Sequence, residues 1–396
     1  MYVVEFTLRS PTCVAQRPTA PGQPTESLRY LTGTVVRGAL ASLFLRGRRP
    51  LSHELSDEER KQFQRIFLSG EVVFGNAWPK HPAEVIWKTT QVVPRTAWSH
   101  KRDGGWRGGD NPGGGVCDAL TALLYDGAEE LTNQGFDRYE QEFACARGGE
   151  WEKIEVRRRL ISRTALTRNE PSLPAAPRGV AAAGQLYSFE AIETGQQFYA
   201  PLHGDTGLID TLFKLFPRRA IASIGQGRSR GIGQVELRIL PSSDPPARDP
   251  SLLAKEARDF TNRARASVEQ IVYLPVTLLS DTILRDNYLV PCSSGDPQVT
   301  LSRYANSPPP KELTLHYAVQ STRWLGGWDA IRDIPRPPQL AVQQGSVWVY
   351  AIPPELLDSA IQWWLTVEAS GVGERRNEGF GQLCLLHTFH ATEAIR

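Results

Sequence analysis

Cysteine is scarce in this sequence, and its placement argues against a disulfide framework. The 396 residues contain five cysteines, an odd number, and no two of them form a Cys-x-x-Cys pair. Such usage is typical of a reducing compartment. A structural zinc site usually shows at least one close ligand pair. We therefore predict no metal and no cofactor, although one region contains His81, His100, Cys117 and Cys145.

Long apolar runs and a strong net charge are also missing. No run approaches the ~20 apolar residues that a membrane helix needs. Residues 1–6 (MYVVEF) indicate a strand rather than a secretory signal. We expect a cytoplasmic protein with no membrane partner. The net charge is +2, with 40% hydrophobic and 22% charged residues, which is ordinary for a globular protein. The length suits two domains of about 150–200 residues each.

Glycine, by contrast, is concentrated in two similar segments, SIGQGRSRGIGQVEL at 223–237 and SGVGERRNEGFGQLC at 370–384. In each, two glycine pairs flank a short basic spacer, and a strand-like run follows. Glycines at this density let the backbone adopt positive φ or approach another backbone closely. Two copies imply two domains of the same kind. The glycines are Gly225, Gly227, Gly231, Gly233, Gly371, Gly373, Gly379 and Gly381.

Arginines between these glycines suggest that the approaching group is a phosphate chain. A further arginine, Arg37, lies in the first turn of a helix predicted over 35–46, where Thr34 is the expected cap and Gly33 the preceding turn. The alternative is that these are solvated surface arginines. The predicted RNA-binding residues include Gly33, Thr34 and the four glycines of the first segment. They also include seven arginines: Arg37, Arg163, Arg168, Arg228, Arg230, Arg375 and Arg376.

Each half of the chain approximates the order β-α-β-β-α-β, which predicts an α+β fold with two ferredoxin-like domains. We place the first at 1–240 with an insertion at about 76–160, a linker and connecting helix at 241–268, and the second at 269–396. Within the first, residues 185–192 and 196–200 are predicted to pair as strands. The proline-rich stretch 168–183 is predicted to be a projecting loop.

The chain resembles the RAMP superfamily of CRISPR-associated proteins, whose hallmark is a G-h-G-x-x-x-x-x-G-h-G loop near the end of a ferredoxin-like domain. Residues 371–381 match this spacing, whereas the spacer at 225–233 is two residues shorter. The order of the segments is similar to the Csx-ten (Cas-five-like) family of type III-D systems. These segments are LTGTVVRGAL at 31–40, with Thr32 where proline is usual, GVAAAGQLY at 179–187, Gly326-Gly327-Trp328, IPRPP at 334–338 and AVQQGSV at 341–347.

This resemblance implies a non-catalytic subunit that grips the 5′ repeat-derived handle of a CRISPR RNA and caps a ribonucleoprotein. Implied partners are the large polymerase-like (Cas-ten-type) subunit, the backbone Cas-seven-type RAMP subunits and, through the complex, target RNA. Relatives often carry cysteine pairs in the insertion, and here the close partners of Cys117 and Cys145 are absent. For the protein contacts, we predict Trp328, in a Gly-Gly-Trp loop, as an anchor. Trp348 is expected to fill the second core.

Two other functions stay open. A Cas-six-like repeat endoribonuclease would need a general base and acid, and the seven histidines are scattered. Asp103, Asp110 and Asp118 lie in the insertion, where loop or capping carboxylates are the simpler interpretation. A protein-only scaffold would use the glycines for tight packing alone. A nucleotide-binding loop is disfavoured because each glycine segment precedes a strand rather than a helix.

Overall fold

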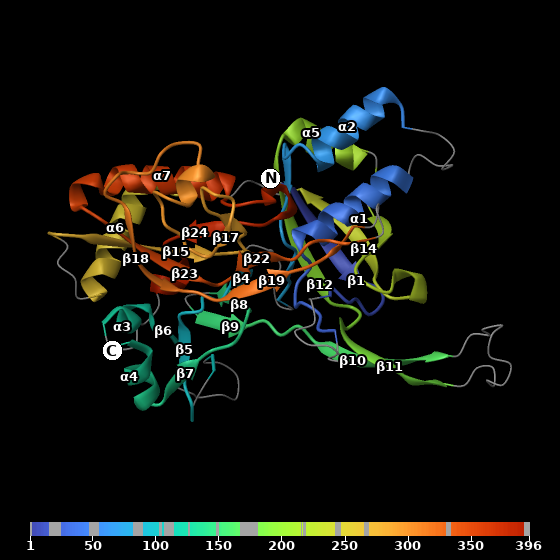
Figure 1. The fold of residues 1–396 in the computed structure, drawn as a ribbon, viewed down its shortest axis with the longest axis horizontal. Helices are drawn as coiled ribbons and strands as arrows, with labels where there is room; N and C mark the ends of the chain where they lie inside the picture. The colour runs from blue at the N-terminus through green and yellow to red at the C-terminus, as the bar shows by residue number, and fades with distance from the viewer. Residues whose placement is uncertain are drawn as a thin grey trace.

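The computed structural model describes most of the chain in two neighbouring sheets with helices and an insertion packed on them (Figure 1). The described residues are 2–15, 25–46, 55–81, 90–102, 105–106, 115–125, 127–147, 150–166, 181–214, 216, 219–241, 247–264, 269–329 and 334–391. Residues 168–180 of the predicted loop lie outside them, as do Arg168, Asp103 and Asp110, whereas residues 181–183 begin a strand and are not loop as predicted.

The N-terminal sheet is antiparallel, with the order β13-β14-β1-β12-β2. Chain order β1-α1-β2-β12-α5-β14 follows the predicted β-α-β-β-α-β plan, and β13 adds an edge strand. Helices α1, α2 and α5 contribute buried residues to the same core as β1 and β12. The bounds are β1 (Tyr2–Leu8), α1 (Gly33–Arg46), α2 (Asp57–Phe67), β2 (Val72–Phe74), β3 (Trp78–Pro79), β12 (Gln197–Gly204), α5 (Thr206–Lys214), β13 (Arg219–Ser223) and β14 (Gln234–Pro241).

The C-terminal sheet has the order β18-β23-β15-β24 and is also antiparallel. The β-α-β-β-α-β order predicts a helix between the first two strands in chain order, β15 and β18, and this prediction is wrong. Residues 279–313 hold only β16 (Leu284–Arg285), β17 (Pro291–Cys292) and the 3-10 turn η3 (Leu301–Arg303). Helix α6 (Pro250–Arg263), which precedes the sheet, packs beside α7 (Leu357–Ser370) in that place. The strands are β15 (Val272–Leu278), β18 (Thr314–Val319), β23 (Val347–Ile352) and β24 (Leu383–Leu385).

Both faces of the C-terminal sheet are covered, which explains why every residue of β15 and β23 is buried. On one face, Trp348 packs with the residues of α6 and α7, as predicted for a core tryptophan. On the other face, Val347 and Val349 pack with Trp98 and Leu120 of the insertion. The 76–160 insertion therefore fills the open side of the C-terminal sheet.

After β3, the described residues of the insertion form two small three-stranded sheets and two short helices. One sheet has the order β4-β8-β9 and the other β6-β5-β7. The bounds are β4 (Thr90–Val92), β5 (Ala97–His100), β6 (Val116–Asp118), α3 (Leu120–Tyr125), α4 (Gly127–Asn133), β7 (Phe136–Arg138), β8 (Phe143–Arg147) and β9 (Glu150–Lys153).

A long two-stranded arm extends away from both sheets (Figure 1). It is formed by β10 (Arg158–Leu166) and β11 (Ala181–Ile192), which pair antiparallel. The predicted pairing of 185–192 with 196–200 is therefore wrong. Residues 197–204 form β12 and pair with β1 instead. Two further ribbons, β19 (Thr322–Leu325) with β22 (Gln339–Val342) and β20 (Trp328–Asp329) with β21 (Ile334–Pro335), complete the C-terminal half.

Candidate nucleic-acid interface

The two glycine-rich loops share one backbone conformation. In the first, Ile224 N donates to Gly233 O at 2.8 Å, and in the second, Val372 N donates to Gly381 O at 2.9 Å. Each loop is also bonded to the segment that follows the first strand of its sheet. Gly233 N donates to Pro11 O at 2.8 Å, and Gly381 N donates to Asp281 O at 2.9 Å. Residues 224–233 therefore correspond to residues 372–381.

This correspondence corrects the sequence alignment of the loops, because the two spacers have equal length. Gly225 corresponds to Gly373 rather than to Gly371. Gly227, with φ of 79°, corresponds to Arg375, with φ of 59°, and each precedes a short 3-10 turn. Those turns are η2 (Arg228–Arg230) and η5 (Arg376–Glu378). In the second loop, an arginine has thus replaced a glycine in the left-handed conformation, where glycine is favoured.

The first turn is exposed and basic. Arg228 and Arg230 are both exposed, between Gly227 and Gly231, which both have positive φ. From the arm, Arg163 donates to Arg230 O at 3.4 Å. Gly225 and Gly233 hold the turn in place, because a Cβ at either would overlap the carbonyl oxygen of Cys13 or Ile224. We call Arg163, Arg228 and Arg230 the basic turn.

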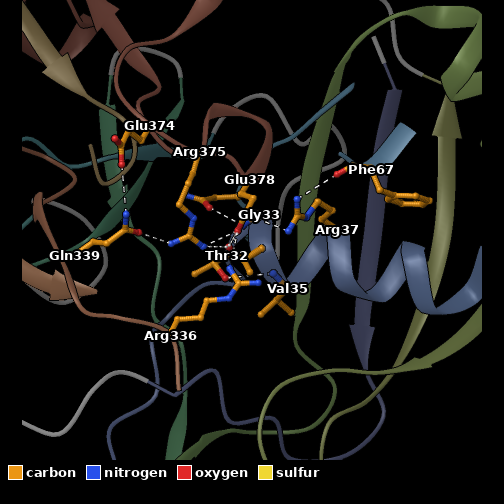
Figure 2. A network of polar contacts seen from close by, with 12 residues as sticks. Thr32, Gly33, Val35, Arg37, Phe67, Arg336, Gln339, Glu374, Arg375 and Glu378 are labelled. Atoms are coloured by element: carbon orange, nitrogen blue, oxygen red, sulfur yellow. Dashed lines mark hydrogen bonds and ion pairs between the residues drawn. The ribbon is translucent and has the colours of Figure 1, made fainter. Parts of the chain in front are cut away.

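The second turn is buried at the junction between the two sheets. Glu378, at the position of Arg230, is 6% exposed. It accepts a hydrogen bond from Thr34 Oγ1 at 2.7 Å and pairs with Arg37 at 3.0 Å, both on α1. From its own loop, Arg375 donates to the carboxylate at 2.6 Å. Arg336 lies 3.7 Å away. Figure 2 shows the three guanidinium groups around this one carboxylate, and we call these five residues the junction cluster.

The junction cluster carries more positive than negative charge. Three guanidinium groups face one carboxylate, and their side chains are 17% (Arg37), 20% (Arg375) and 35% (Arg336) exposed. Burial acts to raise the pKa of Glu378. The hydrogen bond from Arg375 and the charges of Arg375 and Arg37 outweigh burial and lower that pKa below its usual value. Glu378 is therefore ionised and holds α1 against the second loop.

Comparisons with known proteins give only distant similarities. No protein-family model matches the chain, and no curated protein matches it. Among solved structures, a chain of the Type III-B Cmr-beta bound to cognate target RNA and AMPPnP is 10% identical. The similarity covers 88% of this chain and 86% of that one, with a TM-score of 0.43.

Two other solved structures are similar over a smaller part of this chain. Oligomeric Cmr4 from Pyrococcus furiosus is 13% identical over 60% of this chain and 97% of its own, with a TM-score of 0.26. A chain of a Type IV-B CRISPR complex is 12% identical over 63% and 95%, with a TM-score of 0.27. At such values, function has to be argued from the residues themselves.

The predicted RNA-binding residues therefore fall into two groups. Thr34, Arg37 and Arg375 belong to the junction cluster, with Gly33 beside it, and Arg163, Arg228 and Arg230 form the basic turn. Arg376 belongs to neither, because its guanidinium lies against the carbonyl oxygens of Tyr304, Ser370 and Gly371 at 3.4–3.5 Å. RNA contact by any of them stays a prediction.

The start of α1 differs from the prediction by two residues. Thr32, rather than Thr34, is the cap, since Val35 N lies 3.4 Å from Thr32 Oγ1 and Val36 N donates to Thr32 O at 3.0 Å. Gly33 is the first residue of the helix rather than a preceding turn. A Cβ there would overlap the carbonyl oxygens of Phe74 and Glu378. Gly33 thus permits the close approach of the two halves.

Asp118 is a structural residue of the insertion, as its interpretation as a capping carboxylate predicted. Its Oδ1 accepts from Leu120 N at 3.2 Å at the start of α3. Its Oδ2 lies 2.9 Å from His390 Nδ1, and His390 Nε2 lies 2.9 Å from Thr277 Oγ1. Asp118 and His390 are each 2% exposed. This triad therefore joins the insertion to β15 and has no open face for a substrate.

Other predicted features are less informative. Among the described residues, no three His, Cys, Asp or Glu side chains are grouped to hold a metal ion. The helices in the described ranges include none long and apolar enough to cross a membrane. Trp328 begins β20, but its side chain lies outside the described part of the structure, so its role as an anchor stays a prediction.

Proposed function

We propose that this chain is a non-catalytic RNA-binding subunit of a type III CRISPR ribonucleoprotein, in which it holds the 5′ handle of the CRISPR RNA and caps the complex. The proposal takes the two halves as ferredoxin-like RAMP domains of the Csx-ten type. Its partners would be CRISPR RNA, the large polymerase-like subunit, the backbone Cas-seven-type subunits and, through the complex, target RNA.

The observation that carries the proposal is the different exposure of two loops with one backbone. In the second loop, Glu378 of the turn already contacts Thr34 and Arg37 of α1. In the first, the turn is exposed and presents Arg228 and Arg230 beside Arg163 of the arm. Guanidinium groups on a rigid backbone suit phosphate oxygens, and such contacts position RNA without reading its sequence.

A non-catalytic role is supported by one His–carboxylate pair that is closed to RNA. General acid–base catalysis requires a group within hydrogen-bond reach of the substrate. The pair formed by Asp118 and His390 has the chemistry of an acid–base couple, but burial closes it to RNA. Burial, together with smaller effects of the charges of His390 and Arg248, lowers the pKa of the neighbouring His387 to about 3. That imidazole is neutral at physiological pH and equally inaccessible.

The test is the salt dependence of RNA affinity for the full chain. Each lost phosphate contact lowers the slope of log affinity against log salt by roughly one unit. The variant R228A/R230A should therefore bind a CRISPR RNA more weakly, with a slope lower by about two. The control K255A/R258A removes two exposed charges from α6 and should bind as the unmodified chain does.

Two results would contradict the proposal. The first is an R228A/R230A variant with the affinity and salt slope of the control. The second is cleavage of repeat RNA by the purified chain, which would favour the endoribonuclease instead. Comparing RNA that carries the 5′ handle with the same RNA lacking it shows whether binding is specific for the handle.

A further inference from the structure

The hairpin between β16 and β17 presents three consecutive large apolar side chains to solvent. Tyr288 is 87% exposed, Leu289 57% and Val290 54%. Single exposed hydrophobic residues are normal on protein surfaces, whereas a contiguous apolar patch marks an interaction site. We call residues 286–290 the apolar tip. The proposed RNA contacts at the basic turn make no use of it.

The apolar tip has a fixed backbone. The Asp286 carboxylate accepts hydrogen bonds from Tyr288 N and Val290 N, each at 2.9 Å. Leu289 N donates to Asp286 O at 3.0 Å. Leu289 itself has φ of 67°, in the left-handed region that non-glycine residues rarely adopt. Glycine would relieve this strain, and strained residues of this kind are common at functional sites.

The tip is also connected to the junction cluster. Arg285 donates to Leu289 O at 2.9 Å and to Glu374 at 2.7 Å. Glu374 in turn accepts from Gln339 at 3.4 Å, and Gln339 accepts from Arg375 at 3.2 Å (Figure 2). A continuous chain of polar contacts thus runs from Glu378 to the tip. It fixes the position of the tip relative to the first half of the molecule.

We infer that the apolar tip inserts into an apolar pocket on another protein subunit of the ribonucleoprotein, an inference that rests on the proposed function. A protein suits the tip better than RNA. Arg285 and Arg303, the cations that contact the tip, donate to carbonyl oxygens of the tip itself, and Arg285 also to Glu374. Tyr288 alone offers a plane on which a base stacks, whereas Leu289 and Val290 are aliphatic and offer none. A rigid tip also loses little conformational entropy on binding.

Photo-crosslinking in the assembled ribonucleoprotein tests this inference directly. Tyr288 is replaced by benzoylphenylalanine, the complex is irradiated, and the attached molecule is identified by mass. We expect an adduct with a different protein subunit. An adduct with RNA, an adduct with a second copy of this chain, or no adduct would each overturn the inference. Guide RNA is quantified in the same sample. If the chain is in no RNA-containing complex, the proposed function has failed and the inference falls with it.

Leu289→Gly separates docking from structure. Because glycine accepts positive φ, the melting temperature of this variant should equal or exceed that of the unmodified chain. Loss of the side chain should weaken association with the complex, on the order of tenfold. The control is Leu252→Ala on α6, where the leucine is 58% exposed and association should be unchanged. A second variant, Y288S/V290S, removes the other two apolar side chains of the tip. If both variants associate normally with the complex, the docking role is refuted. A marked loss of stability in Leu289→Gly would refute it as well.

Discussion

Replacing Glu378 by alanine tests the junction cluster most severely. The carboxylate is the single anion among Arg37, Arg336 and Arg375, and it also accepts from Thr34. Removing one partner of a buried ion pair costs about 3–5 kcal/mol, because the remaining charge is left buried and uncompensated. Here the guanidinium groups keep partial contact with water, so we take the lower end, about 3 kcal/mol.

The expected loss corresponds to a clear thermal shift. A stability change of 1 kcal/mol moves the midpoint by about 2 °C in a protein larger than 150 residues. E378A should therefore melt about 6 °C lower in differential scanning calorimetry. The matched control is Glu355→Ala, which removes an exposed acid at the start of the 3-10 turn η4 (Pro354–Leu356). That control should stay within about 1 °C of the unmodified chain.

The pH dependence gives a second measure of the same contact. The folded state lowers the pKa of Glu378, so its contribution to stability is complete above the unfolded pKa, about 4.3. The contribution is lost as the pH falls through the folded value. E378A should therefore lose less stability on acidification than the unmodified chain. An E378A melting temperature equal to that of Glu355→Ala would refute the central role that we give to this carboxylate.

Two further outcomes are expected from the structure. Gly233→Ala, at φ of 82° and with a Cβ against Ile224 O, should destabilise by about 3 kcal/mol or more, whereas Gly38→Ala inside α1, with nothing within 4 Å of its Cβ, should stabilise by about 1 kcal/mol. Chemical denaturation measures both, and equal effects would contradict the packing described. For His387, whose pKa of about 3 lies below the unfolded value, stability should fall as the pH drops from about 6.5 towards 3. His387→Asn should flatten that part of a pH–stability curve, and an unchanged curve would show that His387 is not the group responsible.

Two local predictions from the sequence are confirmed. The strand predicted from residues 1–6 is β1, and the helix predicted over 35–46 lies within α1. Helix α2 was missed although its signal is present. Ser56 and Glu59 form a capping box, with Glu59 N donating to Ser56 Oγ at 3.2 Å and Ser56 N donating to Glu59 Oε2 at 3.0 Å.

Long-range contacts could not be predicted in the same way. Glu378 contacts Thr34 across 344 residues of chain, and no local pattern encodes such a pairing. The sequence marked Arg37 and Arg375 as binding residues, but neither Arg336 nor the carboxylate that contacts all three. Asp281 and Arg323 form a second buried pair that was missed for the same reason, with Arg323 also donating to Tyr30 OH at 2.7 Å. The pairing of β11 was wrong because a tight turn at Thr194-Gly195 suggested a local hairpin.

The shared backbone of the two glycine-rich loops has a consequence for how substitutions act in each of them. The glycines set the shape in both copies, so both copies should tolerate few changes at those positions. Between the glycines, the constraint differs. In the second copy, Glu378 is buried and contacts side chains of its own chain, so substitutions at this position should lower the stability of the fold. In the first copy, the corresponding Arg230 is exposed, so substitutions there should cost less stability than substitutions of the buried Glu378.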